Sequence, residues 1–303
     1  MRRPRNKYHR TIGQKTLRNP VERDSDGIDR ITFDSIGAAI RDSMADYAQN
    51  EGNLAFIRAN LAAHFSGTDP WAHYFTKQTL LDVIANPPAE LLAAVEKMRD
   101  QLRDEVAPPV TTRRHVRRNQ DWGDELTPES VLVRSLSPWE RMSRETEAKR
   151  SVTIGVNVSV SCMRKPHELL WRGAAAAALA DILTQRGFNV EIIAYWSITA
   201  MSTGSKHVVA KYLVKRPDMP LDIGTVSVAL AEIAFARLVA LYGLARHMEG
   251  TLDDCLGHPE MLPQRDRLGI DYLADSDILC EGAAVNWITR ASAHAESGVA
   301  HVN

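Results

Sequence analysis

The stretch of sequence that decides the fold is residues 151–161, which read SVTIGVNVSVS. The run is apolar and rich in β-branched residues, which is typical of a buried strand. It ends in Asn157-x-Ser159-x-Ser161, three small side chains that carry oxygen atoms. Because open α/β sheets bind ligands at the carboxyl ends of their strands, these side chains mark a candidate site.

The segments that follow predict an α/β domain over residues 151–303. An alanine-rich helix is expected from His167 to Arg186, with Gly187 at its C-terminal cap and a second strand at 189–196. A strand–helix–strand unit of this kind implies two parallel strands. Further strands are expected at 206–214 and 268–274, and further helices at 224–247 and 282–294. The predicted fold class is a Rossmann-like, mostly parallel sheet flanked by helices.

The first half of the chain predicts a different organisation. Residues 1–30 are expected to be a flexible basic tail, and residues 31–106 an α-helical N-terminal region. In that region, apolar residues at helical spacing predict helices over 31–66, 76–85 and 89–106. Residues 107–150 are expected to be a linker and lead-in segment, with an exposed basic loop and short helical turns around Trp139.

Composition narrows the cellular setting. The formal net charge of −1 gives the whole chain no bias toward nucleic acid or acidic membranes. Three widely spaced cysteines argue against a disulfide framework and for a reducing compartment. No run reaches the roughly 18 apolar residues of a membrane span, and the N-terminus lacks the apolar core of a signal peptide. We therefore expect a cytoplasmic protein without a membrane association.

The candidate site resembles the metal-ion-dependent adhesion motif of von Willebrand factor A (VWA) domains, Asp-x-Ser-x-Ser, with Asn157 in place of the aspartate. The resemblance implies that a divalent cation such as Mg²⁺ binds Asn157, Ser159, Ser161 and Thr225. Asparagine brings a neutral oxygen, and Asp222, three residues before Thr225, would restore negative charge. Two other interpretations stay open. The small residues could satisfy backbone groups at a strand end, or form a partner-contact surface without metal.

The segment before this strand strengthens the resemblance. Residues 121–142, DWGDELTPESVLVRSLSPWERM, are similar to the lead-in before the VWA domain of cobaltochelatase large-subunit-type and MoxR-associated proteins. Those proteins work with an AAA+ ATPase, so the resemblance implies such a partner. We expect a non-enzymatic interaction or adaptor protein rather than an enzyme. Its partner-binding residues would be Asn157, Ser159, Ser161, Thr225 and Asp222, with positive charge from Arg164 and Lys165.

The charge distribution supports an alternative function. Residues 1–20 hold seven basic residues and no acidic ones, and Arg113, Arg114, Arg117 and Arg118 lie within six positions. Clustered cations of this kind bind phosphates. The alternative is a nucleic-acid-associated protein of a viral or plasmid type.

A third group of residues offers metal or catalytic chemistry. His247, Asp253, Asp254, Cys255, His258 and Glu260 are residue types that bind zinc, but Cys255-x-x-His258 is a single half-site. The same pair could act as nucleophile and base in a hydrolase. A solvated loop after a long helix is the simplest interpretation, and no catalytic residue is assigned.

Overall fold

The computed structural model describes the following part of the chain: residues 21–23, 27–44, 55, 82–102, 114–120, 125–126, 139–144, 151–159, 166–200, 206–232 and 258–297, with positions 235, 239, 242, 243, 246 and 247.

A seven-stranded mixed sheet forms the centre of the molecule. Its strands are β1 (Val21–Arg23), β2 (Asp29–Phe33), β8 (Lys206–Lys215), β7 (Asn189–Ala200), β6 (Ser151–Asn157) and β10 (Tyr272–Ala274), in that order, while β9 (His258–Pro259) pairs with β7. β6 is parallel to both β7 and β10, and β2 is parallel to β8. β7 and β8 form an antiparallel pair. The five central strands are therefore mostly parallel, as the sequence predicts.

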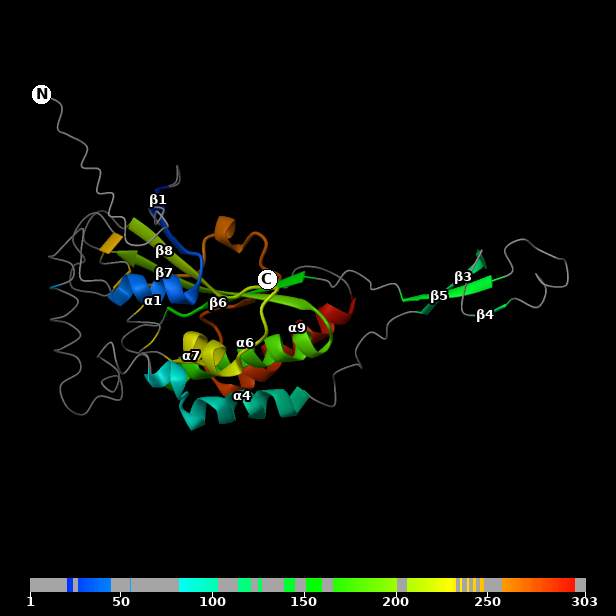
Figure 1. The fold of residues 1–303 in the computed structure, drawn as a ribbon. Coiled ribbons are helices and arrows are strands. Elements are labelled where there is room, and N and C mark those ends of the chain that lie inside the picture. Colours follow the sequence, from blue (N-terminus) through cyan, green and yellow to red (C-terminus); the bar gives the residue numbers. More distant parts are fainter. Residues whose placement is uncertain are drawn as a thin grey trace, which may run out of the picture.

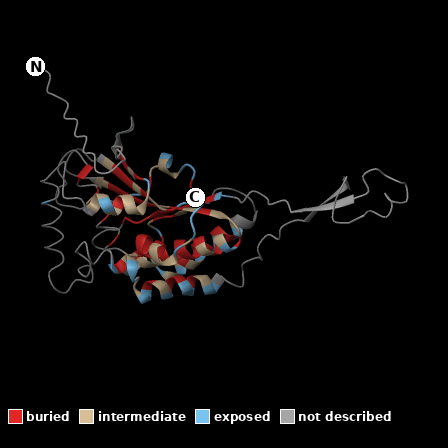
Figure 2. Ribbon diagram, viewed as in Figure 1, coloured by how far each residue is buried: buried red, intermediate tan, exposed pale blue. Residues whose placement is uncertain are grey.

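Helices cover one face of this sheet. They are α6 (Pro166–Gln185), α7 (Ile223–Ala231), α9 (Glu281–Ser297) and, on the outside of α6, α4 (Ala89–Leu102) (Figure 1). Alternate strand residues such as Ile154, Ile192 and Ala210 point into this layer and are almost fully buried. The alanines at 174–178 let α6 lie close to the sheet, and Figure 2 shows this helix buried along most of its length. The fold is thus α/β, with its main core between the sheet and α6.

The opposite face of the sheet has a thinner cover. The 3₁₀ helix η1 (Gln264–Arg267) and its flanking residues lie over it (Figure 1). Leu262 and Ile270 from this segment pack against Tyr195 of β7 and Val209 of β8 in a separate small core. No α-helix of the described residues contributes to that core, so polar side chains of β6, β7 and β8 remain accessible on this face.

The N-terminal region contains a strand as well as helices. The helix predicted from residue 31 begins at Ile36, as α1 (Ile36–Met44), because residues 29–33 form β2. Four of its five residues are buried and only Thr32 is intermediate, because β2 lies inside the sheet between β1 and β8. Residues 82–85 and α4 are helical as predicted, and α4 packs against α6. Of the predicted 53–64 segment only Ala55, which is helical, lies within the described residues.

Residues expected to be linker and helical turns form a second sheet instead. β3 (Arg114–Gln120) and β4 (Glu125–Leu126) both pair antiparallel with β5 (Trp139–Arg144). This three-stranded sheet extends away from the main sheet (Figure 1). Backbone pairing stabilises a strand whatever its side chains, and neither β3 nor β5 shows the apolar alternation that would have indicated it.

Two further predictions of the α/β domain hold only in part. The helix predicted over 224–247 ends first at Ala231, because Glu232 is extended, and the strand predicted over 268–274 is confined to Tyr272–Ala274. α7 occupies the start of the predicted 224–247 helix, and positions 235, 239, 242, 243, 246 and 247 are also helical. Gly187 has φ +88° after α6, as expected for a helix C-terminal glycine. None of the described helices is long and apolar enough to cross a membrane.

Candidate functional site at the carboxyl edge of the sheet

The carboxyl end of β6 lies at the point where the chain changes direction across the sheet. From β6 the chain passes through α6 to β7 on one side, and it later returns to β10 on the other side. Both neighbours run parallel to β6, so three carboxyl ends meet at one edge. Open α/β sheets bind their ligands at such a switch point.

Asn157, the last residue of β6, is fully buried at this edge and uses all of its hydrogen-bonding capacity. Its Nδ2 donates to Asp275 Oδ1 at 2.8 Å and to the main-chain oxygen of Glu260 at 3.1 Å. Its Oδ1 accepts from the Ser159 amide at 3.0 Å and from the Ser159 hydroxyl. An amide side chain has two donor hydrogens and two acceptor lone pairs, and here all four are engaged.

Arg172, from the second turn of α6, adds a positive charge to the same place. Its Nη1 donates to the main-chain oxygen of Asn157 and, at 3.1 Å, to that of Ser159. The side chain is 1% exposed. Burial lowers the Arg172 pKa to about 10, while the negative charges of Asp275, Asp277 and Glu168 oppose that shift. Arg172 is therefore still protonated at neutral pH, and its guanidinium ties the end of β6 to α6.

We call Asn157, Ser159, Arg172 and Asp275 the edge network. Its composition bears on the Mg²⁺ site that the VWA resemblance implies. The Asn157 oxygen already accepts from Ser159, and Asp275 Oδ1 accepts from Asn157 and from the Ser276 amide at 2.7 Å. A hard divalent cation needs free oxygen lone pairs, commonly from carboxylates, and no positive neighbour. The edge network does not fit such an ion, because the Asn157 oxygen and Asp275 Oδ1 face N–H and O–H donors. Asp275 Oδ2 lies 3.7 Å from Arg267 Nη2, and Arg172 supplies a further positive charge. Among the described residues, no three His, Cys, Asp or Glu side chains are grouped to hold a metal.

The other predicted site residues fall in different places. Ser161, Arg164 and Lys165 lie outside the described residues. Asp222 caps the N-terminus of α7, where it accepts from the Thr225 amide at 3.3 Å and from the Thr225 hydroxyl at 2.7 Å. The strand that precedes Asp222 and Thr225 is β8, and it ends at Lys215, opposite Ile192 of β7. Ile192 lies three positions before Tyr195, the residue of β7 that pairs with Asn157. The chain therefore leaves β8 toward the amino edge, and Asp222 and Thr225 bind each other.

Sequence reasoning missed two residues of the edge network. Asp275 lies 118 positions from Asn157 and reaches it only because β10 pairs with β6. The signal available was the polar run Asp275-Ser-Asp277 directly after a short apolar strand. The signal for Arg172 was a single charge between the apolar residues of an otherwise buried helix. A charge in such a position normally has a partner inside the fold.

The part of this edge that a partner can reach is formed by neighbours of the edge network. Glu260 and Asp277 are exposed, and Met261 is 58% exposed. The Glu260 amide donates to the Ser197 main-chain oxygen at 2.9 Å, and the main-chain oxygen of Glu260 accepts from Asn157 Nδ2. The edge network therefore holds an acidic and apolar surface in place.

The predicted His/Cys/Asp group divides between described and undescribed residues. Asp253, Asp254 and Cys255 lie outside the described residues, and His258 is described only as part of β9. His247 is buried, and its Nε2 lies 3.0 Å from both carboxylate oxygens of Asp42 at the end of α1. Arg246 donates to the Ser43 main-chain oxygen at 3.0 Å. His247 thus ties the helical turn that contains it to α1.

Comparison with known proteins identifies a family and no individual relative. Residues 19–281, most of the chain, match the model of a family described as a domain of unknown function, DUF7192. The chain belongs to this family. Neither the curated proteins nor the solved structures contain a match.

Proposed function

We propose that this protein is a non-enzymatic interaction protein that binds a protein partner at the carboxyl edge of its main sheet. The observation that carries the proposal is the meeting of Asn157, Ser159 and Asp275 at the switch point between β6 and β10. Four elements of the chain converge there in one hydrogen-bonded network. All four hydrogen-bonding positions of the Asn157 side chain are engaged in this network, which fixes the end of β6 as a base for recognition.

The contacts themselves fall on the surface that this base supports. Met261 offers an exposed apolar side chain, exposed Glu260 precedes it in the chain, and exposed Asp277 lies two residues after Asp275 of the edge network. Apolar anchors surrounded by charge are typical of interaction sites, in which the anchor supplies affinity and the charges select the partner. The partner expected from this chemistry has an apolar pocket bordered by Lys or Arg.

The type of partner follows from the family resemblance alone. The Asn157-x-Ser159-x-Ser161 motif and the 121–142 lead-in resemble those of VWA proteins that act with an AAA+ ATPase. We therefore propose an adaptor that presents this edge to an AAA+ ATPase of the same organism.

Surface substitutions test whether the partner binds at this edge of the sheet. Met261→Asp combined with Asp277→Lys changes both the apolar anchor and a flanking charge, without touching the edge network. Met219→Asp is the matched control, because Met219 is 53% exposed in the turn between β8 and α7. The intact protein and the Met219 variant should form a complex with the purified ATPase in light scattering, and the double variant should not. Equal binding by both variants, or no complex at all, would refute the proposal.

A specific feature of the second sheet favours nucleic-acid binding as a second candidate function. β3 and β5, which we call the ribbon, hold five arginines and one glutamate. Arg114 lies opposite Arg144, and Arg117 lies opposite Arg141. Like charges directly opposite one another destabilise an antiparallel pair. A polyanion along the ribbon would remove that cost, and the major groove of DNA admits a two-stranded ribbon. Arg118 also lies on β3, while Arg113 and the basic tail lie outside the described residues.

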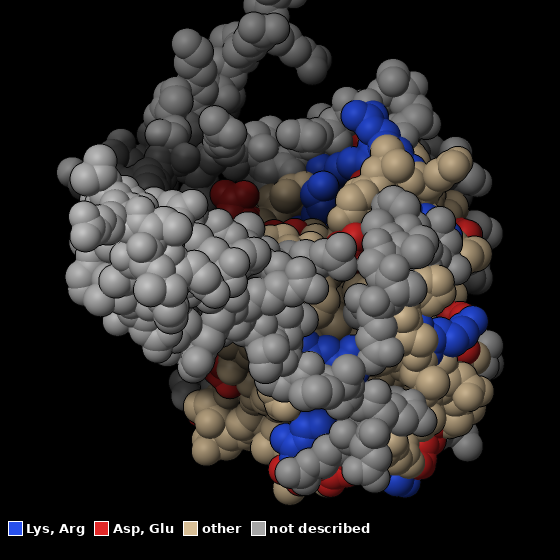
Figure 3. Space-filling model, turned by 90° about the vertical axis from the view of Figure 1, so that its right-hand side faces the viewer, with Lys and Arg blue, Asp and Glu red and all other residues tan. Residues whose placement is uncertain are grey.

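On the face shown in Figure 3, acidic and basic side chains of the described residues are interspersed. Nucleic-acid binding is tested by fluorescence anisotropy with duplex DNA at increasing salt. Arg117→Gln with Arg141→Gln should lower the slope of log affinity against log salt by about 2, because each arginine neutralises one phosphate group. Arg290→Gln on the exposed side of α9 should leave the slope unchanged. A slope that is the same in all three proteins would exclude the ribbon.

A further inference from the structure

The thinly covered face of the main sheet carries a cleft of about 330 Å³. Its floor consists of side chains from β2, β6, β7 and β8, and the segment 265–270 forms one wall. The volume is within the range of sites for small molecules. The cleft lies on the opposite face of the sheet from α6 and takes no part in the partner surface proposed above.

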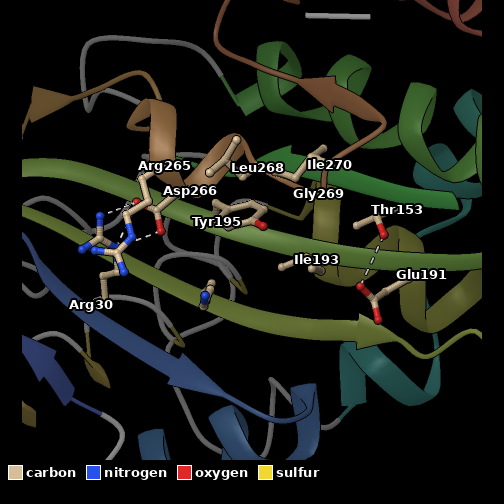
Figure 4. A pocket seen from close by; sticks show the side chains of 11 residues that line it. Arg30, Thr153, Glu191, Ile193, Tyr195, Arg265, Asp266, Leu268, Gly269 and Ile270 are labelled. Carbon is tan, nitrogen blue, oxygen red and sulfur yellow. Dashed lines mark hydrogen bonds and ion pairs between the residues drawn. The ribbon is translucent and has the colours of Figure 1, made fainter. Parts of the chain in front are cut away.

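One end of the cleft is positively charged. Arg30 binds Asp266 through two pairs of atoms, Nε to Oδ1 at 2.9 Å and Nη2 to Oδ2 at 2.8 Å. Both side chains are at least 93% buried, so this pair is close to neutral as a unit. Arg265 lies beside Arg30 (Figure 4) and adds an exposed positive charge. Lys211 adds another. Its ammonium group has no hydrogen-bond or ion-pair partner among the residues that the structure describes.

The middle of the cleft offers a hydroxyl donor. Tyr195 lies directly opposite Lys211 on the neighbouring strand and is 3% exposed. Within the described part of the chain, its hydroxyl has no hydrogen-bond partner. Burial, assisted by the negative charges of Asp266 and Glu191, raises the Tyr195 pKa well above its usual range. The phenol therefore stays protonated and can donate one hydrogen bond to a ligand in the cleft.

The other end combines apolar surface with a carboxylate. Ile193 and Ile270 line the cleft beyond Tyr195, and Leu268, which is 77% exposed, stands at its rim (Figure 4). Past them, Glu191 accepts from the Thr153 hydroxyl at 3.5 Å, a long hydrogen bond that leaves most of its acceptor capacity unused. Along β7, Glu191 lies four residues from Tyr195, which is roughly 13 Å of extended strand.

We propose that this cleft binds a nucleoside monophosphate, with the phosphate at Lys211 and Arg265, the ribose at Tyr195 and the base between Ile193, Ile270 and Leu268. Along the cleft, Arg265 lies at one end, Lys211 and Tyr195 lie at the same level of neighbouring strands, and the apolar walls and Glu191 follow, an order that matches phosphate, sugar and base. Glu191 then accepts from N–H groups on the far edge of the base. Guanine presents two adjacent N–H donors there, so a carboxylate favours it over adenine.

Isothermal titration of the intact protein with GMP, AMP and guanosine tests the assignment. GMP should bind, AMP should bind more weakly, and guanosine, which lacks the phosphate, should bind about tenfold or more weakly than GMP. Lys211→Gln should weaken GMP binding about tenfold, the effect of removing one charge-assisted hydrogen bond. Glu191→Gln should remove the preference for GMP over AMP.

Two controls distinguish the cleft from general anion binding. Arg216→Gln removes an exposed cation directly after β8 and should leave GMP affinity unchanged. Tyr195→Phe keeps the aromatic ring, so it should lower affinity without lowering the melting temperature. The proposal is overturned if GMP fails to bind at millimolar concentration, if inorganic phosphate competes as well as GMP, or if Lys211→Gln binds GMP like the unchanged protein.

Discussion

Replacing Asn157 by aspartate tests whether the edge network depends on an amide. The substitution keeps the shape of the side chain and restores the acidic residue of the VWA motif, but it removes both Nδ2 donors. The bond to Asp275 has a charged acceptor and contributes about 1.5–3 kcal/mol, and the bond to the Glu260 oxygen contributes about 1 kcal/mol. A second buried carboxylate would also face Asp275, and one of the two would have to take up a proton.

The expected cost of Asn157→Asp is therefore about 3–4 kcal/mol of unfolding free energy. For a chain of 303 residues that corresponds to a fall in melting temperature of about 5–6 °C. Differential scanning calorimetry at pH 7.5 with EDTA measures it directly. Asn286→Asp is the matched control, because Asn286 is exposed on α9 and its change should stay within about 0.5 kcal/mol. If Asn157→Asp melts within about 1 °C of the unchanged protein (~0.5 kcal/mol), the amide is not required and the argument from the edge network fails.

Three further predictions concern metal, packing and pH. Millimolar Mg²⁺ should leave the melting temperature of the unchanged protein as it is in EDTA, because the Asn157 oxygen and Asp275 Oδ1 already accept hydrogen bonds. A saturable rise in melting temperature would show a bound ion. Gly173→Ala should destabilise the fold by about 1–3 kcal/mol or more in urea unfolding, because its Cβ would lie 2.5 Å from Leu230 and Ala231 of α7. Gly282→Ala, with open space around it, should be neutral or slightly stabilising, and equal effects at the two sites would contradict this packing. Burial raises the pKa of Tyr212 above its usual value, so its contribution to stability is complete below about pH 10 and is lost as the pH rises through the folded-state pKa. Between about pH 9 and pH 11 the Tyr212→Phe variant should therefore lose less unfolding free energy than the unchanged protein, by up to about 1.4 kcal/mol per pH unit. Parallel curves of unfolding free energy against pH would contradict the raised pKa of Tyr212.

The parts of the fold that the sequence predicts correctly are those in which local pattern and tertiary role agree. The β6–α6–β7 unit has a β-branched run, an alanine-rich helix and a C-terminal glycine in the expected order, and each segment is long enough to show its period. β2 was missed because five residues directly before a helix show too little alternation to overcome the helical pattern that follows. β3 and β5 were missed because backbone pairing holds them and their arginines do not alternate with apolar residues.

The candidate site was predicted in part for a similar reason. Asn157 and Ser159 follow a strand, so their position at the carboxyl edge can be inferred from local sequence. Asp275 and Arg172 join them through strand pairing and helix packing, which no short motif records. Thr225 and Asp222 have the right residue types, but the antiparallel direction of β8 sends the chain toward the other edge, and there they cap α7.

Hydrogen–deuterium exchange of the intact protein, alone and with an AAA+ ATPase of the same organism, tests the proposed interaction role most directly. The proposed contact surface comprises residues 258–263 and 275–280, so we expect slower amide exchange in those two segments and unchanged exchange in the ribbon. Protection confined to residues 114–144, or no protection anywhere, would contradict docking at the carboxyl edge.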